Sequence, residues 1–266
     1  MNRPPTTAAA ARQAFLPVCR ADMAARGWDQ LDVLLVSGDA YVDHPAFGVP
    51  LLGRLLEARG YRVGILAQPD WRDPAAFTVM GRPRLCVALS AGAMDSLVNH
   101  YTAAGKKRRD DAYTPGGRAG ARPNRALIAY TAAARAAFRQ LPVLIGGIEA
   151  SLRRLAHYDY WSDSVRRSLL IDSKADLLLY GMAENALLAV VEALAAGATL
   201  TELRQLPGCA WVSSGPLAGV QLPSYEQVAS DREAYGRAFA LASRNAAALL
   251  VQPHGDRFVV VNPPAP

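Results

Sequence analysis

The sequence contains few cysteines, and they do not form a cluster. Its three cysteines, Cys19, Cys86 and Cys209, lie far apart along the 266 residues, and none belongs to a Cys-x-x-Cys pair. Zinc and iron–sulfur sites need several thiolates at close spacing, so we expect neither kind of site within this chain. Cys86 lies in an apolar run and is expected to be a buried thiol.

Long hydrophobic runs are also missing. The apolar stretches end after about 5–8 residues, whereas a membrane-spanning helix needs about 20. The first twenty residues hold several alanines but no apolar segment of the kind that signal peptides carry. We therefore expect a cytoplasmic chain that does not enter a membrane. Its apolar fraction of 51% and charged fraction of 20% are typical of a globular protein.

Several familiar ligand motifs are absent as well. The chain has no G-x-G-x-x-G fingerprint, no P-loop and no G-x-S-x-G nucleophile motif. The cobalamin pattern Asp-x-His-x-x-Gly is broken, because Asp43 directly precedes His44 and Gly48 comes one position late. We therefore do not expect tight cobalamin binding. His44 stays a candidate ligand, but we expect a turn residue held by Asp39 or Asp43.

The net charge of +6 comes mostly from arginine. A basic protein can bind nucleic acid, but here the basic residues are scattered. Their one run, residues 106–109, is followed at once by two aspartates. The charge pattern therefore does not favour a nucleic-acid partner.

Apolar strands alternate with helices along most of the chain. We expect strands over residues 31–36, 61–67, 84–89, 142–145 and 177–180, and helices over 49–59, 126–140 and 184–196. Continuous apolar strands separated by helices indicate a parallel sheet covered on both faces. The predicted fold class is therefore α/β, with a doubly wound, mainly parallel, Rossmann-like sheet.

This Rossmann-like domain is expected over residues 30–215, after an N-terminal arm of residues 1–29. Residues 216–266 are expected to form one long helix over 225–251, a short strand over 257–261 and a proline-rich linker toward another domain. Residues 101–125 are too long and too rich in Gly, Arg and Pro for an ordinary connector, and a loop of this length is usually functional or disordered.

Polar residues gather where the predicted strands end, which is where parallel sheets bind ligands. The densest stretch is residues 146–163, between two apolar strands. We assign no catalytic residue. The candidates for facing a ligand or another domain are Asp39, Asp43, His44, Asp70, Gly146, Gly147, Glu149, Arg153, His157, Asp159, Tyr160 and Arg166.

Two interpretations of the stretch around His157 stay open. With Asp159 and Tyr160, this histidine would suit an acid–base group, and it would equally suit a polar cluster that holds a long loop in place. Ser162 is expected to cap a helix over residues 163–170. We expect the charged residues here to be exposed, so that replacing Arg153 or Asp159 changes stability little.

Several strings of this sequence resemble the N-terminal part of the YgiQ-type radical S-adenosylmethionine proteins. The most specific are DAYVDHP at residues 39–45 and HYDYWSD at residues 157–163. Further matching stretches bring the resemblance to nearly the whole chain: residues 27–48, 60–71, 90–103, 108–126, 146–181 and 254–266.

The resemblance implies a cobalamin-binding type of Rossmann domain placed ahead of a radical domain. In that family a later Cys-x3-Cys-x2-Cys loop holds a [4Fe-4S] cluster, at which S-adenosylmethionine is cleaved to a radical. This sequence contains no such loop, so we expect no cofactor of its own and no activity from this chain alone. The expected partner is a radical SAM domain, in cis or as a separate chain. The alternative is a free-standing ligand- or partner-binding module without catalytic activity.

Overall fold

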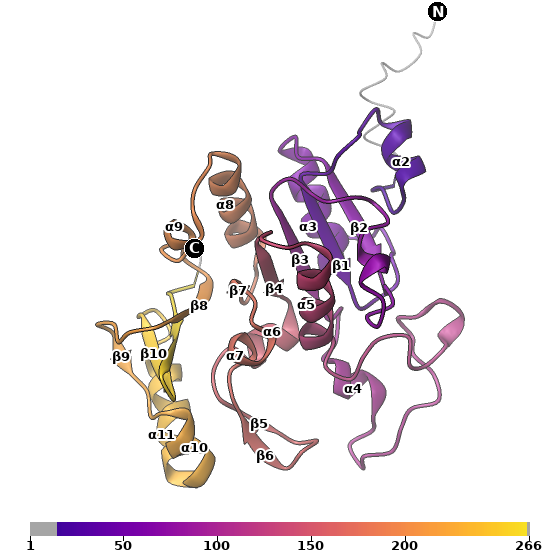
Figure 1. The fold of residues 1–266 in the computed structure, drawn as a ribbon. Helices are drawn as coiled ribbons and strands as arrows, with labels where there is room; N and C mark the ends of the chain where they lie inside the picture. Colours follow the sequence, from indigo (N-terminus) through magenta and orange to yellow (C-terminus); the bar gives the residue numbers. More distant parts are fainter. Residues whose placement is uncertain (1–14, 265–266) are drawn as a thin grey trace, which may run out of the picture.

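The computed structural model describes residues 15–264, which form a layered α/β structure around one nine-stranded sheet (Figure 1). The strand order is β2-β1-β3-β4-β7-β8-β11-β10-β9. The strands are β1 (Val33–Ser37), β2 (Val63–Ala67), β3 (Cys86–Ser90), β4 (Val143–Gly146), β7 (Leu177–Leu179), β8 (Cys209–Ser213), β9 (Val220–Gln221), β10 (Leu250–His254) and β11 (Arg257–Val261).

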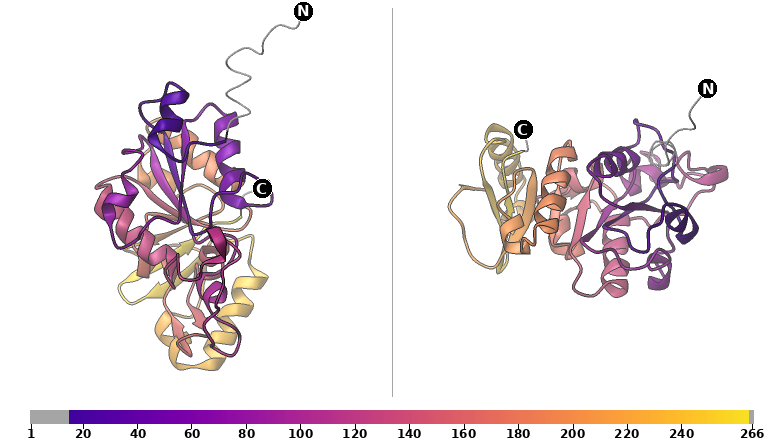
Figure 2. Two further views of the ribbon diagram at one scale, coloured as in Figure 1. Left: turned by 90° about the vertical axis from the view of Figure 1, so that its right-hand side faces the viewer. Right: turned by 90° about the horizontal axis from the view of Figure 1, so that it is seen from above.

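The sheet divides into a parallel part and an antiparallel extension. Strands β2, β1, β3, β4 and β7 run parallel, and β8, β11 and β10 follow with antiparallel pairing. Short β9 then pairs parallel with β10 at the edge. Seen from above, this extension lies at the opposite end of the molecule from the N-terminal elements (Figure 2). The predicted doubly wound, mainly parallel α/β fold is confirmed.

Helices cover both faces of the parallel part. The helices are α2 (Arg20–Ala25), α3 (Gly48–Ala58), α4 (Ser96–His100), α5 (Ala126–Ala137), α6 (Ile148–Leu152), α7 (Leu169–Ser173), α8 (Glu184–Ala195), α9 (Leu200–Leu203), α10 (Tyr225–Ser230) and α11 (Arg232–Arg244), with short 3-10 turns η1 (Pro74–Phe77) and η2 (Pro115–Gly117). Helices α3 and α8 contact each other on one face, and α5 contacts α7 on the other.

Two hydrophobic cores follow from the alternation of side chains along the strands. Leu34 and Val36 of β1 point into the core beneath α5, whereas Val33 and Leu35 point into the core beneath α3 and α8. Burying apolar surface contributes about 25 cal/mol per Å², so covering both faces stabilises the central strands strongly. None of the described helices is long and apolar enough to span a membrane.

The predicted single helix over 225–251 is wrong. Asp231 interrupts it with an extended backbone (φ −132°, ψ 116°), and its side chain accepts a hydrogen bond from the N–H of Glu233 at the start of α11. Helix α11 then ends at Arg244, and residues 250–254 form β10. An aspartate competes with the helix by capping, which explains why the alanine-rich pattern was misleading.

The predicted helix over 163–170 is also wrong. Residues His157–Asp159 (β5) and Ser164–Arg166 (β6) form a two-stranded hairpin. Asp163 adopts φ +46° in its turn, a conformation that does not begin a helix. Ser162 donates to the Asp159 carboxylate instead of capping. The helix that follows is α7, and its cap is Ser168.

Candidate functional site

The strand ends of the parallel part meet at a switch point between β1 and β3. The chain leaves β1 through α3 on one face and leaves β3 toward α5 on the other, so their connecting loops diverge. In open α/β sheets, ligand sites lie at the carboxyl ends of strands at such a point. The two loops also touch, since Gly38 N–H donates to Ser90 O at 3.0 Å.

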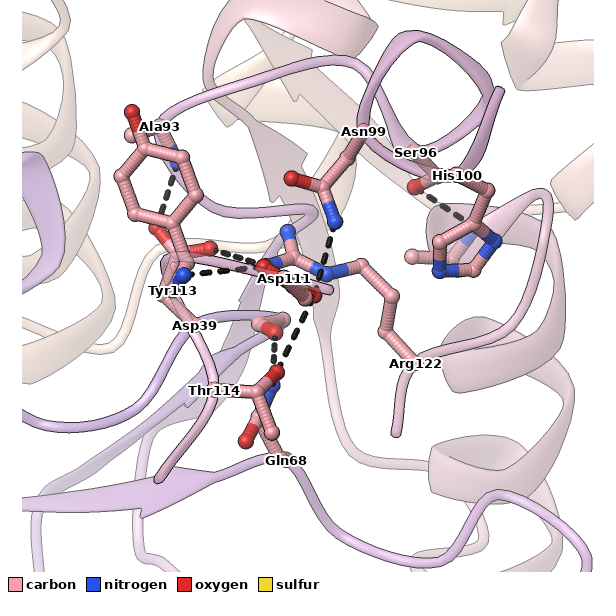
Figure 3. A network of polar contacts seen from close by, with 12 residues as sticks. Asp39, Gln68, Ala93, Ser96, Asn99, His100, Asp111, Tyr113, Thr114 and Arg122 are labelled. Carbon is pink, nitrogen blue, oxygen red and sulfur yellow. Dashed lines mark hydrogen bonds and ion pairs between the residues drawn. The ribbon is translucent and has the colours of Figure 1, made fainter. Parts of the chain in front are cut away.

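A buried arginine joins the long loop 101–125 to these strand ends (Figure 3). The Arg122 side chain is fully buried, and its Nη2 lies 2.8 Å from Asp39 Oδ1 and 3.3 Å from Asp111 Oδ2. Its Nη1 donates to the carbonyl of Ala91 at 2.9 Å. One guanidinium therefore holds two carboxylates and the loop after β3 together.

Further hydrogen bonds complete this network. Asp111 accepts from Asn99 Nδ2 at 2.7 Å and from Thr114 Oγ1 at 3.0 Å. Gln68, at the end of β2, donates to Thr114 Oγ1 at 2.7 Å and to Gly38 O at 2.9 Å. The long loop is therefore attached to the ends of three strands, and we call this the Arg122 network, formed by Asp39, Gln68, Asn99, Asp111, Thr114 and Arg122.

The two carboxylates of the Arg122 network have opposite pKa shifts. Burial raises the pKa of Asp39 above its usual value, although the nearby Arg122 charge opposes this. Burial also acts to raise the pKa of Asp111, but the hydrogen bond from Tyr113 N–H and the Arg122 charge outweigh it, so that pKa is lowered. Arg122 therefore favours the charged form of both carboxylates, but only at Asp111 do the favourable contacts outweigh burial.

A second feature is a cleft lined by residues of the β5–β6 hairpin and of α4. Both elements lie at the same end of the molecule as the long loop (Figure 1). We call this feature the hairpin cleft. Its volume is about 440 Å³, and Trp161 stacks on Tyr101 at its rim with ring centres 3.8 Å apart. Tyr160 donates from its hydroxyl to Ala103 O at 2.6 Å. Its exposed apolar side chains are Val98, Leu152, Tyr158, Tyr160 and Trp161.

Ion pairs form the base of the hairpin cleft. Arg153 donates to Asp95 Oδ2 from Nε at 2.9 Å and from Nη2 at 2.6 Å, and Arg125 pairs with Asp159. The Asp159 side chain is only 2% exposed and that of Arg153 15%. The expectation that these two residues are exposed is therefore wrong: Asp159 is buried within the hairpin and pairs with Arg125, and Arg153 is half-buried because it pairs with Asp95.

The His157 ring contacts Arg153 of one ion pair with one nitrogen and the backbone of Leu155 with the other. Its Nδ1 lies 3.2 Å from Leu155 O, which accepts the ring proton, and its Nε2 lies 3.4 Å from Arg153 Nη1. Burial lowers the pKa of His157 to about 4. A general acid needs a pKa nearer the working pH, so this geometry favours the interpretation in which His157 holds the loop.

We predict that the fold loses stability in mild acid through His157. The folded ring binds its proton with a pKa of about 4 instead of 6.5. The neutral His157 ring therefore contributes fully to the free energy of unfolding above pH 6.5. This contribution is lost as the pH falls from 6.5 toward 4, and the loss amounts to roughly 2–3 kcal/mol. Urea unfolding at pH 7 and pH 4.5 measures this loss.

The His157→Gln variant provides the control for this prediction, because it has no titrating ring at that position. Burial also lowers the pKa of His254, and the variant retains that second source of acid sensitivity. We expect the variant to lose clearly less stability between the two pH values than the parent chain. An equal loss in both proteins would show that His157 does not carry the effect.

The remaining candidate residues do not all lie at one site. Glu149 is buried and accepts from Ser96 N–H at 2.9 Å, which ties α6 to α4. Asp70 is exposed beside Arg72, and Arg166 pairs with Asp172 at 2.8 Å, away from the hairpin cleft. The structure brings together Arg153, His157, Asp159 and Tyr160 at the hairpin cleft, and Asp39, Gly146 and Gly147 at the ends of β1 and β4.

The turn that contains His44 has different contacts from those we expected. Its Nδ1 accepts the N–H of Ala46 at 3.1 Å, and neither Asp39 nor Asp43 holds the ring. Asp43 instead pairs with Arg54 of α3. His44 is a turn residue as expected, but its partner is the backbone.

We therefore still predict that the chain does not retain cobalamin. Incubation with hydroxocobalamin followed by gel filtration is expected to leave the protein colourless. Retained corrinoid absorbance that disappears in His44→Ala would contradict this and would identify the ring as a ligand.

Sequence reasoning missed the residues that organise both features. Arg122, Arg125 and Asp111 lie in the Gly- and Pro-rich loop, and Asp95 and Asn99 lie shortly before it. None of them follows a predicted strand, so the rule about strand ends did not select them. The available signal was the loop itself, which is too long for a plain connector.

The cysteines do not fit an iron–sulfur cluster. Cys86 in β3 and Cys209 in β8 are both buried in the apolar core beneath α3 and α8, whereas Cys19 is exposed. Burial raises the pKa of both buried thiols to about 12, which disfavours the thiolates that a cluster needs. In residues 15–264, no three His, Cys, Asp or Glu side chains come together in a way that would hold a metal.

Fold and site together define a doubly wound α/β domain whose strand ends are covered by a long anchored loop and a hairpin. The family described as Radical SAM N-terminal matches residues 15–266, and the chain belongs to it. UPF0313 protein GSU2873 of Geobacter sulfurreducens is 57% identical over 259 residues, which are 94% of this chain and 43% of that protein. A UPF0313 protein of Thermotoga maritima is 48% identical and is matched over 45% of its length. The chain therefore spans less than half of these relatives.

One solved structure with a similar fold is TsrM from Kitasatospora setae, a radical S-adenosylmethionine methyltransferase bound to tryptophan and a SAM analogue. The likeness covers 67% of this chain and 28% of TsrM, with 18% identity and a TM-score of 0.41.

Proposed function

We propose that this chain is an accessory domain of a radical SAM protein and that its hairpin cleft contacts the radical domain. In that arrangement the radical domain supplies the [4Fe-4S] cluster and cleaves S-adenosylmethionine, and this chain contributes the substrate side. The chain itself holds no cofactor and is inactive alone, which agrees with its scattered thiols.

The observation that supports this proposal is the hairpin cleft. Leu152 is 63% exposed and Tyr160 65%, and they lie on a surface whose base is fixed by ion pairs to two buried carboxylates, Asp95 and Asp159. Exposed aromatic and aliphatic side chains on a rigid base are typical of protein interfaces. The Geobacter sulfurreducens relative is more than twice as long as this chain. The part of that relative which this chain does not match is the partner that we propose for this surface.

The alternative is a free-standing module that binds a ligand or another protein. The same hairpin cleft would then face a partner unrelated to the radical domain. The two proposals differ in one result, namely whether the chain binds the part of a relative that it does not match.

A docking titration tests the proposal. The part of the Geobacter sulfurreducens protein that this chain does not match is purified and shown to be folded by circular dichroism, and then titrated by calorimetry. We expect saturable binding that Leu152→Glu weakens at least tenfold, or about 1.4 kcal/mol. A charged side chain in a buried interface must be desolvated, whereas at an exposed position it costs the free chain little.

The control is Phe239→Glu, which places the same charge at another exposed apolar residue, 71% exposed on α11. This variant should bind like the parent chain. Absence of binding by the parent, or equal weakening by both variants, would favour the free-standing module.

A further inference from the structure

A pocket of about 320 Å³ lies at the ends of β1, β3 and β4, beneath α3 and α8. It shares no residue with the hairpin cleft. On this face the side chains near the carboxyl ends of the strands are small. Leu35 is followed by Ser37 and Leu144 by Gly146, and β3 has only Ala88 and Ser90 there.

These small side chains explain why the space is not filled. Residues two apart in a strand share a face. The leucines pack into the core with helices α3 and α8, whereas the small residues after them do not reach those helices. Gly147 adds no side chain, and a Cβ there would lie 2.8 Å from Ser90 Oγ. Val49 and Leu52 of α3 and Leu187 of α8 form the apolar wall opposite the strands.

Few polar groups line the pocket. Asp39 is the only ionisable residue among its described lining residues, and its side chain is 5% exposed. Its Oδ1 lies 2.8 Å from Arg122 Nη2 and its Oδ2 accepts from Ala93 N–H at 2.6 Å, so each oxygen keeps a lone pair for a further donor. Ser37 Oγ accepts from Asp39 N–H at 3.0 Å and Ser90 Oγ accepts from Gly92 N–H at 3.1 Å. Each hydroxyl keeps its own hydrogen for a further bond.

Helix α3 begins at the same pocket. Its N-cap is Phe47, whose side chain makes no capping hydrogen bond. The first N–H groups of a helix have no acceptor within the helix, so those of Gly48 and Val49 are available at the mouth. The pocket therefore combines apolar walls with two hydroxyl donors, two backbone donors and one carboxylate acceptor.

We propose that this pocket binds an uncharged aromatic heterocycle of a small molecule. Its volume falls within the range of roughly 300–1,000 Å³ that small-molecule sites occupy. Apolar walls accommodate the ring, the Asp39 carboxylate accepts a ring N–H, and the hydroxyl and backbone donors meet ring acceptors. An anionic ligand is disfavoured, because among the described lining residues there is no lysine or arginine and the one charge is negative.

Three small probes test the chemistry of the pocket. Indole, 1-methylindole and indole-3-carboxylate have the same ring system but differ in the N–H and in charge. Titration into the 15N-labelled chain should show saturable indole-dependent shifts at Gly48, Ser90 and Gly147. We expect 1-methylindole to bind at least threefold more weakly and indole-3-carboxylate at least tenfold more weakly.

Two variants locate the binding. Ala88→Leu fills the pocket from the strand side, and Gly48→Leu narrows its mouth at a position where a Cβ meets nothing within 4 Å. Each should weaken indole binding at least tenfold. The matched control is Gly236→Leu on α11, where a Cβ also meets nothing within 4 Å, and it should bind indole like the parent chain.

Gly48→Leu decides the question if Ala88→Leu fails to fold. The proposal is overturned if the parent chain shows no indole-dependent shifts, if Gly48→Leu binds indole with parental affinity, or if the carboxylate binds more tightly than indole. Because the radical domain is absent from this experiment, its failure is separate from a failure of docking.

Discussion

Arg122→Met is expected to lower the free energy of unfolding by about 3–5 kcal/mol at pH 7, because it leaves buried carboxylates without their cation. Asp39 and Asp111 lie within ion-pair distance of the Arg122 guanidinium, and all three side chains are at most 5% exposed. Methionine fills much of the volume, so the loss reports charge more than packing. Urea unfolding followed by circular dichroism measures it.

Two controls separate this effect from a general cost of losing arginine. Arg72→Met removes an exposed partner of Asp70 and should cost less than about 1 kcal/mol. The triple variant Asp39→Asn, Asp111→Asn, Arg122→Met removes the charges together and should recover much of the stability. If Arg122→Met costs no more than Arg72→Met, the Arg122 network does not anchor the loop.

Gly147→Val is expected to destabilise the fold by at least about 2 kcal/mol. Gly147 has φ +86°, which a β-branched residue adopts only with strain. Its new Cβ would also lie 2.8 Å from Ser90 Oγ at the end of β3. Thermal unfolding by calorimetry should show a clearly lower Tm than that of the parent chain.

Gly116→Val is the matched control for this substitution. Gly116 also has a positive φ of +68°, but a Cβ there meets nothing within 4 Å. The difference between the two variants therefore reports the close approach of β3 and β4 at their ends. Equal losses would mean that backbone strain alone explains the effect, and a neutral Gly147→Val would contradict the geometry at this strand end.

The parallel part of the fold could be predicted because its signals are local. The apolar runs of β1 to β4 and the helical spacing of α3 and α8 are continuous in sequence, and the glycines at 60 and 197 end those two helices with φ +86° and +89°. The antiparallel extension has weaker signals. Only five residues separate α11 from strand β10, and several of them are alanines that continue the helical pattern in sequence. Only the aspartate at 231 marks where helix α10 ends.

The candidate residues could be predicted only where the strand-end rule applies. That rule selected Asp39, two residues after β1, and Gly147, directly after β4. It did not select Arg122, which reaches the same place from a loop more than thirty residues after β3 begins. The β5–β6 hairpin also depends on ion pairs with residues outside it, because the Asp159 carboxylate contacts Arg125 and Arg153. No pattern within residues 157–166 indicates those partners.

The position of β11 within the sheet has a consequence for how the chain folds during synthesis. Although β11 is the last strand along the described chain, it lies between β8 and β10. Strands β9 and β10 are made earlier, yet they join the sheet only through β11. On the ribosome, the parallel part can assemble first, while β9 and β10 can pair with each other but cannot join the sheet until residue 261 emerges. A pause just before that point would prolong the exposure of the β8 edge, where another strand could pair instead.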